Sequence, residues 1–378
     1  MKIKLGELAN IMTGNTPSMK VNEYYDSNDI PFIKPDSFKS HFKLEANSFI
    51  SNKAETKARI VGANCILVSC IGIIGKVGIT SQKVAFNQQI NSLKVKPHYD
   101  IEYIAYNLIF NKDRLQGICN SAVVPLINKS QFSNFEISIN KDIIIQRDIK
   151  SKLNLLSSII INNKKRLLLL DDIVKSRFVE IFKNNKAHIA IGELFQVIDG
   201  DRGKNYPKAT DFFDEGYCLF LNAKNVTKNG FCFDTVQFIT QQKDEQLNKG
   251  RVLPEDIILT TRGTVGNVAY CDIESSHKHM RINSGMVILR SKDIIYDVDF
   301  ITYVLSNQIN YGKEISGSAQ PQLPISKLKD IMIPFPEIFL QKDFGYLIKQ
   351  INKLKSDVQK SIDETQLLMD SLMQEYFG

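Results

Sequence analysis

Two short glycine turns are the parts of this sequence whose residue types and spacing are best suited to chemistry. Gly72 and Gly75 enclose two residues after one apolar run, and Gly263 and Gly266 do the same after another. This spacing is too short for the glycine fingerprint of a dinucleotide site, and no GxxxxGK[ST] loop for nucleotide phosphates occurs. Glycine lets the backbone turn tightly and approach another molecule closely. The turns therefore indicate close approach of the backbone to another group, and we expect them to be architectural rather than direct readers of a ligand.

No set of catalytic residues accompanies these turns. The sequence has no GxSxG or HExxH motif and no Asn/Asp-Pro-Pro-aromatic motif of the kind that an amino-methyltransferase uses to hold a flipped base. His277 and His279 could bind a metal by their spacing, but they lie in a polar stretch, so we expect solvated histidines and no metal site. We predict a chain that is not an enzyme and works by recognition.

The composition is that of an ordinary globular protein. The chain has 378 residues, 43% hydrophobic and 24% charged, which allows two domains with a core each. No apolar run reaches the roughly 18 residues of a membrane span, and MKIKLGELAN lacks the apolar core of a signal peptide, so we expect no membrane contact. The six cysteines form no CxxC pair, which predicts buried free thiols and a cytoplasmic location.

The net charge of +7 is unevenly divided along the chain. Residues 1–187 hold 27 basic and 16 acidic side chains, and residues 188–378 hold 21 basic and 25 acidic ones, so the halves carry +11 and −4. A basic half suits a polyanion, because lysine and arginine that neutralise phosphates release counterions. The acidic half does not, so composition alone gives weak support for nucleic-acid binding.

The whole chain is one unit repeated twice. LGEL at residues 5–8 returns as IGEL at residues 191–194, the two glycine turns correspond, and Asn87 aligns with Asn283. The offset between the copies drifts from 186 to about 196, which places small insertions in loops. It then stays at 195 through residues 146–182 and 341–377. A constant offset fits a continuous helix, since an insertion would rotate every later side chain off its face.

Two long helices are accordingly predicted within residues 141–185 and 337–378. In each helix, positions taken alternately four and three residues apart are mainly apolar and form one stripe, here called the seam. In the first helix the seam continues to Arg177 and Ile181. Such a seam favours pairing of the two helices over packing of each on its own domain, and its polar members Asn163 and Lys355 could fix the register. The seam residues expected to pair the helices are Leu153, Leu156, Ile160, Asn163, Leu167, Leu170, Val174, Ile348, Ile351, Lys355, Val358, Ile362, Met369 and Leu372.

The segments between the helices have a mixed pattern. Short β-branched runs at residues 30–33, 66–70, 76–80 and 92–95 are typical of strands, whereas residues 100–112 and 299–309 follow the helical period. We predict the α+β class, as a tandem repeat in which a small mixed α/β domain precedes each long helix. The domains are expected at residues 1–140 and 186–336.

The ordered set of motifs resembles the specificity subunit of type I restriction–modification systems. It comprises the LGEL and IGEL openings, the Gly-x-x-Gly turn after a strand, Asn87-Gln88-Gln89 and Asn283, and closing helices that begin Gln-Arg/Lys-Asp. Each motif is weak alone, but the set occurs twice in order and covers essentially the whole chain. The resemblance implies two target-recognition domains related by a pseudo-two-fold, each reading one half of a split, asymmetric DNA sequence, with the helices paired as an antiparallel coiled coil.

The resemblance also implies partners and cofactors. Double-stranded DNA is the expected ligand. The helices would form a spacer and a docking surface for two DNA adenine methyltransferase subunits, which restriction subunits join. No cofactor is expected on this chain, because S-adenosylmethionine would bind the methyltransferase and ATP the restriction subunit. A helix of roughly 35 residues is about 50 Å long, which suits a spacer between half-sites.

Candidate DNA contacts come from positions that match the family. The loop at residues 13–17 resembles the Gly-x-Thr-Pro loop that often follows the first motif, and residues 199–203 depart from it. Arg262 matches an arginine common in the family; it could bind a phosphate or a guanine edge, or form a surface ion pair. The first copy has Ile71 there. Asn87 and Gln88 could read adenine, cap a strand or satisfy buried backbone groups.

A second group of candidates lies in a loop that many family members enrich in glutamine. Gln320 and Gln322 occupy it, whereas the first copy has Val-Val-Pro at residues 123–125. The full set of candidate DNA contacts is Thr13, Gly14, Asn15, Thr16, Lys34, Gly72, Gly75, Lys76, Asn87, Gln88, Gln89, Asp201, Arg202, Asn222, Lys224, Arg262, Gly263, Gly266, Asn283, Gln320 and Gln322.

An alternative of a different class is a coiled-coil scaffold that oligomerises and binds protein partners without DNA specificity. The acidic second half favours it. Binding to a defined duplex that weakens with salt would distinguish DNA recognition from this alternative.

Overall fold

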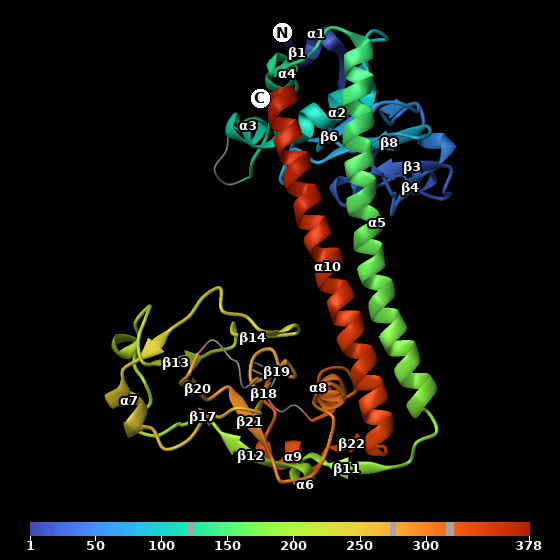
Figure 1. Cartoon of the computed structure of the whole chain (residues 1–378). Coiled ribbons are helices and arrows are strands. Elements are labelled where there is room, and N and C mark those ends of the chain that lie inside the picture. Colours follow the sequence, from blue (N-terminus) through green and yellow to red (C-terminus); the bar gives the residue numbers. More distant parts are fainter. Residues whose placement is uncertain (120–123, 273–276, 315–320) are drawn as a thin grey trace. The chain divides into compact units, whose positions relative to one another are not determined.

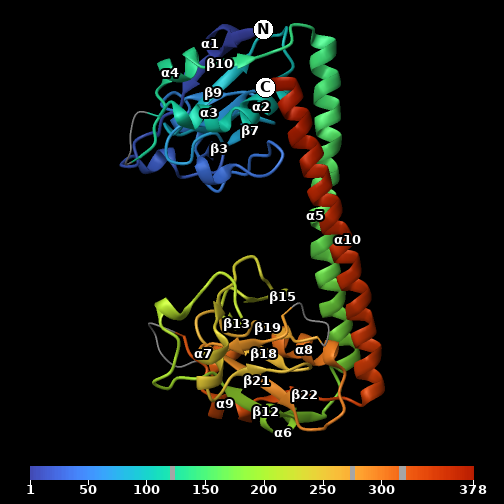
Figure 2. The same ribbon diagram turned by 60° about the vertical axis from the view of Figure 1, so that its left-hand side comes forward.

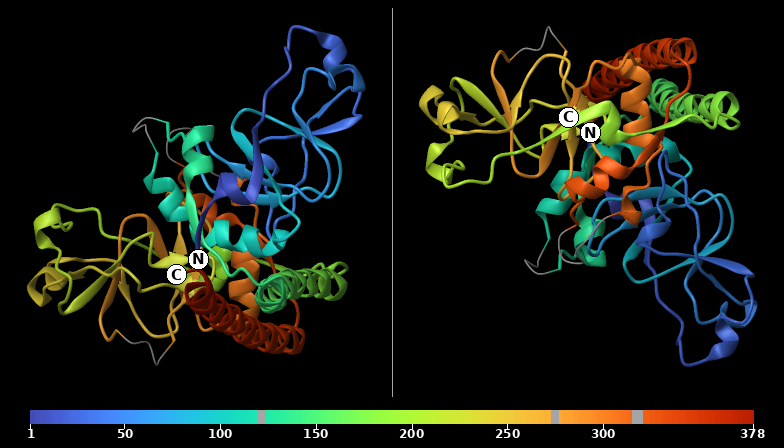
Figure 3. Two further views of the ribbon diagram at one scale, coloured as in Figure 1. Left: turned by 90° about the horizontal axis from the view of Figure 1, so that it is seen from above. Right: turned by 90° about the horizontal axis from the view of Figure 1, so that it is seen from below.

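The computed structural model describes residues 1–119, 124–272, 277–314 and 321–378 (Figure 1). The chain forms two compact units, one of Met1–Leu167 with Asp357–Gly378 and one of Leu168–Ser356. Both chain ends belong to the first unit (Figure 3). The predicted segments separate domains from helices, whereas the units divide inside the helices, because each half of a helix packs on the domain beside it.

The domain of the first unit is built on two four-stranded sheets. One has the strand order β2-β9-β6-β7 and is antiparallel, and the other has the order β4-β3-β8-β5 with β3 and β8 parallel. A further pair joins β1 to β10. The strands are β1 Lys2–Lys4, β2 Ala9–Thr13, β3 Ile30–Ile33, β4 Phe49–Ile50, β5 Ile60–Val61, β6 Ile66–Ser69, β7 Val77–Ile79, β8 Val84–Phe86, β9 Ile90–Val95 and β10 Glu136–Ser138.

The second unit repeats this arrangement. Its sheets have the orders β12-β21-β18-β19 and β16-β13-β20-β17, again with one parallel pair, β13–β20, and β11 pairs with β22. A small hairpin, β14–β15, is added. The strands are β11 His188–Ala190, β12 Phe195–Asp199, β13 Cys218–Leu221, β14 Val226–Thr227, β15 Gly230–Phe231, β16 Phe238–Ile239, β17 Arg251–Val252, β18 Ile257–Thr260, β19 Val268–Tyr270, β20 Met280–Ile282, β21 Met286–Ser291 and β22 Met332–Pro334.

Short helices cover these sheets, and the predicted α+β tandem repeat is confirmed. In the first unit the α-helices are α1 Leu5–Leu8, α2 Ile101–Phe110, α3 Lys112–Gly117 and α4 Lys129–Asn134, and the 3-10 helices are η1 Asn22–Tyr24, η2 Pro35–Ser37 and η3 Asn52–Ala54. In the second unit they are α6 Ile191–Leu194, α7 Gln241–Gln246, α8 Val298–Asn307 and α9 Ile325–Asp330, with η4 Ala209–Asp211 and η5 Tyr311–Lys313.

Two 40-residue helices, α5 Ile143–Phe182 and α10 Ile338–Phe377, close the two copies. Their first turns explain the glutamine in the Gln-Arg/Lys-Asp motif. Gln146 is buried, donates to the carbonyl of Asn140 at 2.6 Å, and accepts from the backbone N–H of Asp100 at 2.8 Å. Gln341 makes the same two bonds in the second copy. The motif therefore ties each long helix to the first turn of α2 or α8.

Within each unit the two long helices lie antiparallel. In the first unit Asn163 of α5 donates to the hydroxyl of Ser361 of α10 at 3.1 Å. In the second unit the ammonium of Lys355 pairs with the carboxylate of Asp171. Both polar seam residues thus bind across the pair, as a register-fixing residue does. The buried seam residues are Leu153, Ile160, Asn163, Val174, Ile348, Ile351 and Ile362, and the half-buried ones are Leu156, Leu167, Leu170, Lys355, Val358, Met369 and Leu372.

The end of α5 departs from the predicted seam. Arg177 is exposed and pairs with Glu180 at 2.8 Å, while Phe178 and Phe182 are buried instead. The physical reason is a third helix: α8 lies between the sheet and the long helices (Figure 2). The ring of Phe182 lies 5.2 Å from that of Phe300 in α8 and 5.5 Å from that of Phe344 in α10. Contact with two helices widens the buried face beyond a two-helix seam.

Candidate nucleic-acid interface

The predicted loop at residues 13–17 lies against the Asn87 turn in the first domain. The backbone N–H of Gly14 donates to the carbonyl of Ile90 and that of Asn15 to the carbonyl of Phe86, both at 3.0 Å. A Cβ atom on Gly14 would lie 2.2 Å from the carbonyl oxygen of Asn87. Glycine is therefore required for this approach, which brings two segments far apart in sequence into one cluster.

The polar side chains of this loop divide into exposed and internally bound groups. Thr16 and Gln88 are both exposed and joined by a hydrogen bond of 2.7 Å from the Thr16 hydroxyl to Oε1 of Gln88. Thr13 instead donates to Asn91 at 2.6 Å, and Asn15 donates to the carbonyl of Lys57 at 2.7 Å. Thr16 and Gln88 are thus the members of the loop cluster that solvent reaches most easily.

Asn87 and Asn283 hold the same turn in the two copies. Oδ1 of Asn87 accepts from the backbone N–H of Gln89 at 3.1 Å, and Oδ1 of Asn283 accepts from that of Gly285 at 2.9 Å. Asn87 also donates to the Gln89 side chain at 2.8 Å. Of the roles open for Asn87, these hydrogen bonds perform the satisfaction of a backbone N–H group.

The glycine turns have the same backbone conformation in both copies. Gly72 and Gly75 have φ of +74° and +83°, and Gly263 and Gly266 have φ of +73° and +97°, values that favour glycine. A hydroxyl pins each turn. Ser69 donates to the carbonyl of Ile73 at 2.5 Å, and Thr260 donates to that of Thr264, also at 2.5 Å. The tight turns read from the sequence are therefore present and held rigidly.

Lysine and asparagine candidates surround these turns. Nζ of Lys76 donates to the carbonyl of Pro35 at 2.9 Å, which ties the turn to the loop after β3. Nζ of Lys34 lies 5.5 Å from the centre of the Phe32 ring. In the second copy Oδ1 of Asn222 accepts from the backbone of Lys224 at 2.9 Å, and the Lys224 side chain is exposed. Lys224 is the most accessible cation of this group.

In the second domain the loop after β12 takes the place of residues 13–17. A Cβ atom on Gly200 would lie 2.1 Å from the carbonyl of Asn283, so this loop makes the same close approach as Gly14. Asp201 is buried and accepts backbone N–H groups of Gly203 and Asn248, both at 2.8 Å. Burial opposes its charged form, but these hydrogen bonds hold the pKa of Asp201 below its usual value. The carboxylate of Asp201 therefore supports the loop from inside.

The remaining candidates lie beside the second glycine turn. Arg202 is exposed and its Nη2 lies 3.1 Å from Asp199. Arg262 forms an antiparallel bridge with Gln322, as Ile71 does with Leu126 in the first copy. Leu126 is thus the counterpart of Gln322, just beyond the Val-Val-Pro segment matched to it by sequence. Gln320 lies outside the described residues.

Among the described residues, the structure therefore brings the loop after the first long strand, the glycine turn and the asparagine turn of each copy together in one loop cluster. Four contributors were missed from the sequence: Gly200, Gly285 and the residues whose hydroxyls hold the turns, Ser69 and Thr260. The hydroxyls had a signal, because a small hydroxyl residue ends the apolar run before the turn in both copies. Gly200 aligns with Gly14, but the divergent sequence around it concealed the match.

Known proteins share this arrangement. A family model described as the type I restriction modification DNA specificity domain matches residues 1–170 and again residues 184–365. The chain belongs to this family. It is 24% identical over 406 aligned positions to the MjaIX type I restriction enzyme specificity subunit of Methanocaldococcus jannaschii, covering 98% of this chain and 90% of that one. It is also 34% identical over 143 positions to the HindI specificity subunit of Haemophilus influenzae, covering 35% and 30% of the two chains.

Solved structures of the specificity-subunit family have the same fold. The S subunit of the type I restriction–modification system of M. genitalium superposes with a TM-score of 0.62 at 16% identity, covering all of this chain and 96% of that one. A chain from a study of assembly and conformational transition in the type I system gives 0.63 at 13% identity, covering 100% and 97%. The protein is a DNA-recognition component of a restriction–modification system, and the comparisons give the scaffold alternative no support.

Substituting Gly14 tests the loop cluster of this specificity subunit. Gly14→Ala should displace the loop from Asn87 and destabilise the first unit by about 1–3 kcal/mol, the usual cost of overpacking, because the new Cβ meets backbone that cannot move aside. Thermal unfolding by circular dichroism measures the change. Gly62→Ala is the control, since nothing lies within 4 Å of that Cβ and its φ is ordinary. Equal melting temperatures for the two variants would contradict the close approach.

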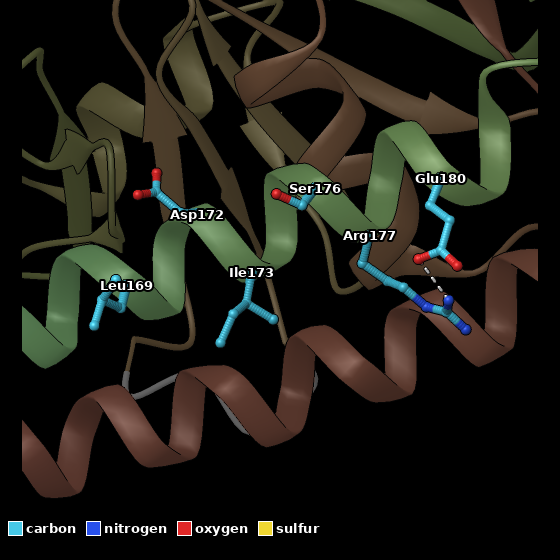
Figure 4. A pocket seen from close by; sticks show the side chains of 6 residues that line it. All are labelled: Leu169, Asp172, Ile173, Ser176, Arg177 and Glu180. Carbon is cyan, nitrogen blue, oxygen red and sulfur yellow. Dashed lines mark ion pairs between the residues drawn. The ribbon is translucent and has the colours of Figure 1, made fainter.

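The long helices present a second accessible surface. A groove of about 490 Å³ runs over the second-unit part of α5, lined by Leu169, Asp172, Ile173, Ser176, Arg177 and Glu180 (Figure 4). Other large apolar side chains on the outer faces of the helices are exposed as well. They are Ile144, Ile145, Leu155, Ile159, Leu168, Val179, Phe339, Tyr346, Leu354, Leu367 and Leu368. Together with Leu169 and Ile173 in the groove, these exposed apolar side chains suit a surface that binds another protein.

Within the described part of the chain there is no group of histidine, cysteine and acidic side chains able to hold a metal, and no helix is apolar enough over a sufficient length to cross a bilayer. His277 and His279 are half-buried, not solvated as expected, because His279 stacks on Tyr217 at 4.2 Å and His277 packs on Phe233. All six thiols are free; Cys119 and Cys232 are half-buried and the other four are buried.

Proposed function

We propose that each loop cluster reads one half of a split, asymmetric DNA target, and that this chain performs no catalytic step itself. The observation that carries the proposal is that the two loop clusters have the same backbone arrangement but carry different side chains. Residues 13–17, the glycine turn and residues 87–89 form the first, and residues 199–203, the second glycine turn and residues 283–285 form the other. A shared backbone arrangement with different side chains fits two domains that bind DNA in the same way but recognise different base sequences.

The helices would hold the partner enzymes. Exposed apolar residues of α5 and α10, with the groove at Ile173, suit the docking of two DNA adenine methyltransferase subunits, to which restriction subunits would bind. S-adenosylmethionine would then be bound by the methyltransferase and ATP by the restriction subunit. A methyltransferase placed on each half of the helix pair would reach the half-site read by the adjacent domain.

Mapping of methylated adenines tests the proposal. We expect that co-expression with the methyltransferase encoded beside this chain yields methylation of a split motif on both strands, seen by long-read sequencing. Exchanging residues 1–140 for those of another specificity subunit should change one half of the motif and leave the other intact. The unchanged half is the internal control. A complex that forms but methylates no split motif, or an exchange that alters both halves, would refute two independent readers.

A further inference from the structure

The glycine turns of the two domains have similar backbone conformations, but the residue before the first glycine is an isoleucine in one and an arginine in the other. Ile71 and Arg262 both precede a glycine with φ near +74°, and both form an antiparallel bridge to the following loop. The backbone of the residue before each of them makes an equivalent hydrogen bond. The N–H of Cys70 donates to the carbonyl of Gln89 at 2.7 Å, and the N–H of Thr261 donates to the carbonyl of Gly285 at 2.8 Å. The backbone N–H of Arg262 also donates to the carbonyl of Gly285, at 3.1 Å, and the main difference between the two positions is the side chain.

The second copy has a glycine beside its arginine. Gln89 in the first copy corresponds to Gly285 in the second, two residues after the capping asparagine. A Cβ atom built on Gly285 would lie 3.3 Å from Oδ1 of Asn283 and 3.7 Å from Cβ of Arg262. A side chain at Gly285 would therefore lie in van der Waals contact with the start of the Arg262 side chain, so the residue at position 285 is a direct neighbour of Arg262.

Arg262 has a donor without a partner. Its Nε is buried, and among the described residues it has no hydrogen-bond acceptor. Within the same part of the chain no carboxylate pairs with Arg262, so the surface ion pair considered from the sequence is not formed. A buried donor without an acceptor costs free energy. Such a donor is tolerated where a ligand supplies the missing acceptor, or where the aliphatic part of the arginine is held so that its two terminal amino groups point in a fixed direction.

The chemistry of this guanidinium suits a base edge better than a phosphate. A phosphate contact needs charge but little orientation, and the exposed Lys224 can provide it in the same domain. Arg262 is half-buried with a fixed backbone and an enclosed Nε, which limits the directions of its two end groups. A planar fork held in this way matches O6 and N7 of guanine, the commonest specific contact to DNA.

The equivalent turn of the first domain cannot make that contact. Ile71 is half-buried, and Ile73 is 60% exposed at the tip of the turn. These side chains offer no hydrogen-bond donor and suit apolar contact, such as the methyl group of thymine.

We infer that Arg262 selects a guanine in the half-site read by the second domain, and that the first domain makes no such contact at its equivalent turn. The inference rests on the proposed function and names the base chemistry of one of its two sites.

Arg262→Lys and Arg262→Ala, in the full chain co-expressed with the methyltransferase, test it by methylation mapping. Both should relax one guanine position of one half-site by about 5- to 150-fold, the discrimination of a good bidentate contact, and leave the other half-site unchanged. Lysine keeps the charge but loses the fork, so it should fail almost as alanine does. If Arg262 binds a phosphate, lysine will restore activity and the motif will stay the same, which overturns the inference.

Two controls keep this outcome separate from failure of the proposed function. Ile71→Ala alters the equivalent position and should leave the half-site of the second domain unchanged. Arg262→Met should melt at the same or a higher temperature than the unaltered chain, because it removes an unsatisfied donor; a clear fall would mean a structural role. A wild-type chain that methylates no split motif refutes the proposed function, whereas a split motif whose second half contains no guanine sensitive to Arg262 refutes only the inference.

Discussion

Replacing Asp244 with alanine should destabilise the second unit by about 3–5 kcal/mol, the usual cost of removing one partner of a buried ion pair. Nε of Arg281 donates to Oδ1 of Asp244 at 2.7 Å, and both side chains are 2% exposed. Without the carboxylate the guanidinium keeps only the carbonyls of Lys249 and residue 244 as acceptors, at 2.5 and 2.9 Å. Hydrogen exchange of second-unit amides in urea would measure the loss, with first-unit amides as the internal reference.

Arg251→Ala is the matched control for this pair. Arg251 binds the other oxygen of Asp244 at 2.6 Å, but its side chain is 55% exposed. Solvent-exposed pairs contribute about 0–1 kcal/mol, so the variant should be nearly as stable as the unaltered chain. If Arg251→Ala cost as much as Asp244→Ala, the buried contact would not be the one that holds this sheet together.

Removing the charge of Asp244 should also alter the response of the second unit to acid. Burial opposes the charge on Asp244, but Arg281 and Arg251 lower its pKa below the usual value. A carboxyl with a lowered pKa in the folded state stabilises the protein above its unfolded pKa, about 3.9, and this stability is lost as the pH falls through the folded value. The second unit should therefore weaken below about pH 4, and Asp244→Asn should flatten that dependence.

The sequence was sufficient to predict the main strands, the glycine turns and the long helices, because these elements depend on local patterns that occur twice. The run Ile66–Ser69 and the glycine turn after it define β6, and the constant repeat offset defines α5 and α10. The second sheet of each domain was largely missed. Strands such as β5 Ile60–Val61 have two residues, and the parallel pairing of β3 with β8 joins segments about fifty residues apart. Such pairing depends on tertiary contacts that no local pattern records.

The candidate site was predicted to the level of loops and not of side chains. Asn87 and Gln88 are adjacent, yet one is buried in a cap and the other exposed, and Asp201 and Arg202 differ in the same way. Which residue faces outward depends on the backbone of the turn. The buried Arg281 did leave a signal, since an arginine between Met280 and Ile282 in an apolar strand needs an internal partner.

Replacing Ile160 with aspartate should open the helix pair and abolish methyltransferase docking while both domains stay folded. Ile160 of α5 and Ile362 of α10 are each 6% exposed, and neither belongs to the core of a domain, unlike Leu153 or Phe377. The substitution loses the burial of an isoleucine, about 2–5 kcal/mol, and adds the cost of enclosing a carboxylate, several kcal/mol. Because a docking surface formed by both helices requires them to stay paired, the loss should fall on assembly.

Co-purification with the tagged methyltransferase measures docking, and hydrogen exchange shows whether α5 and α10 have separated. Asn162→Asp is the control, because it adds the same carboxylate at the neighbouring exposed position of α5. It should leave docking unchanged. If Ile160→Asp opens the helices and the methyltransferase still co-purifies at the normal ratio, docking does not depend on the paired helices, and the exposed apolar residues beside the groove at Ile173 need another explanation.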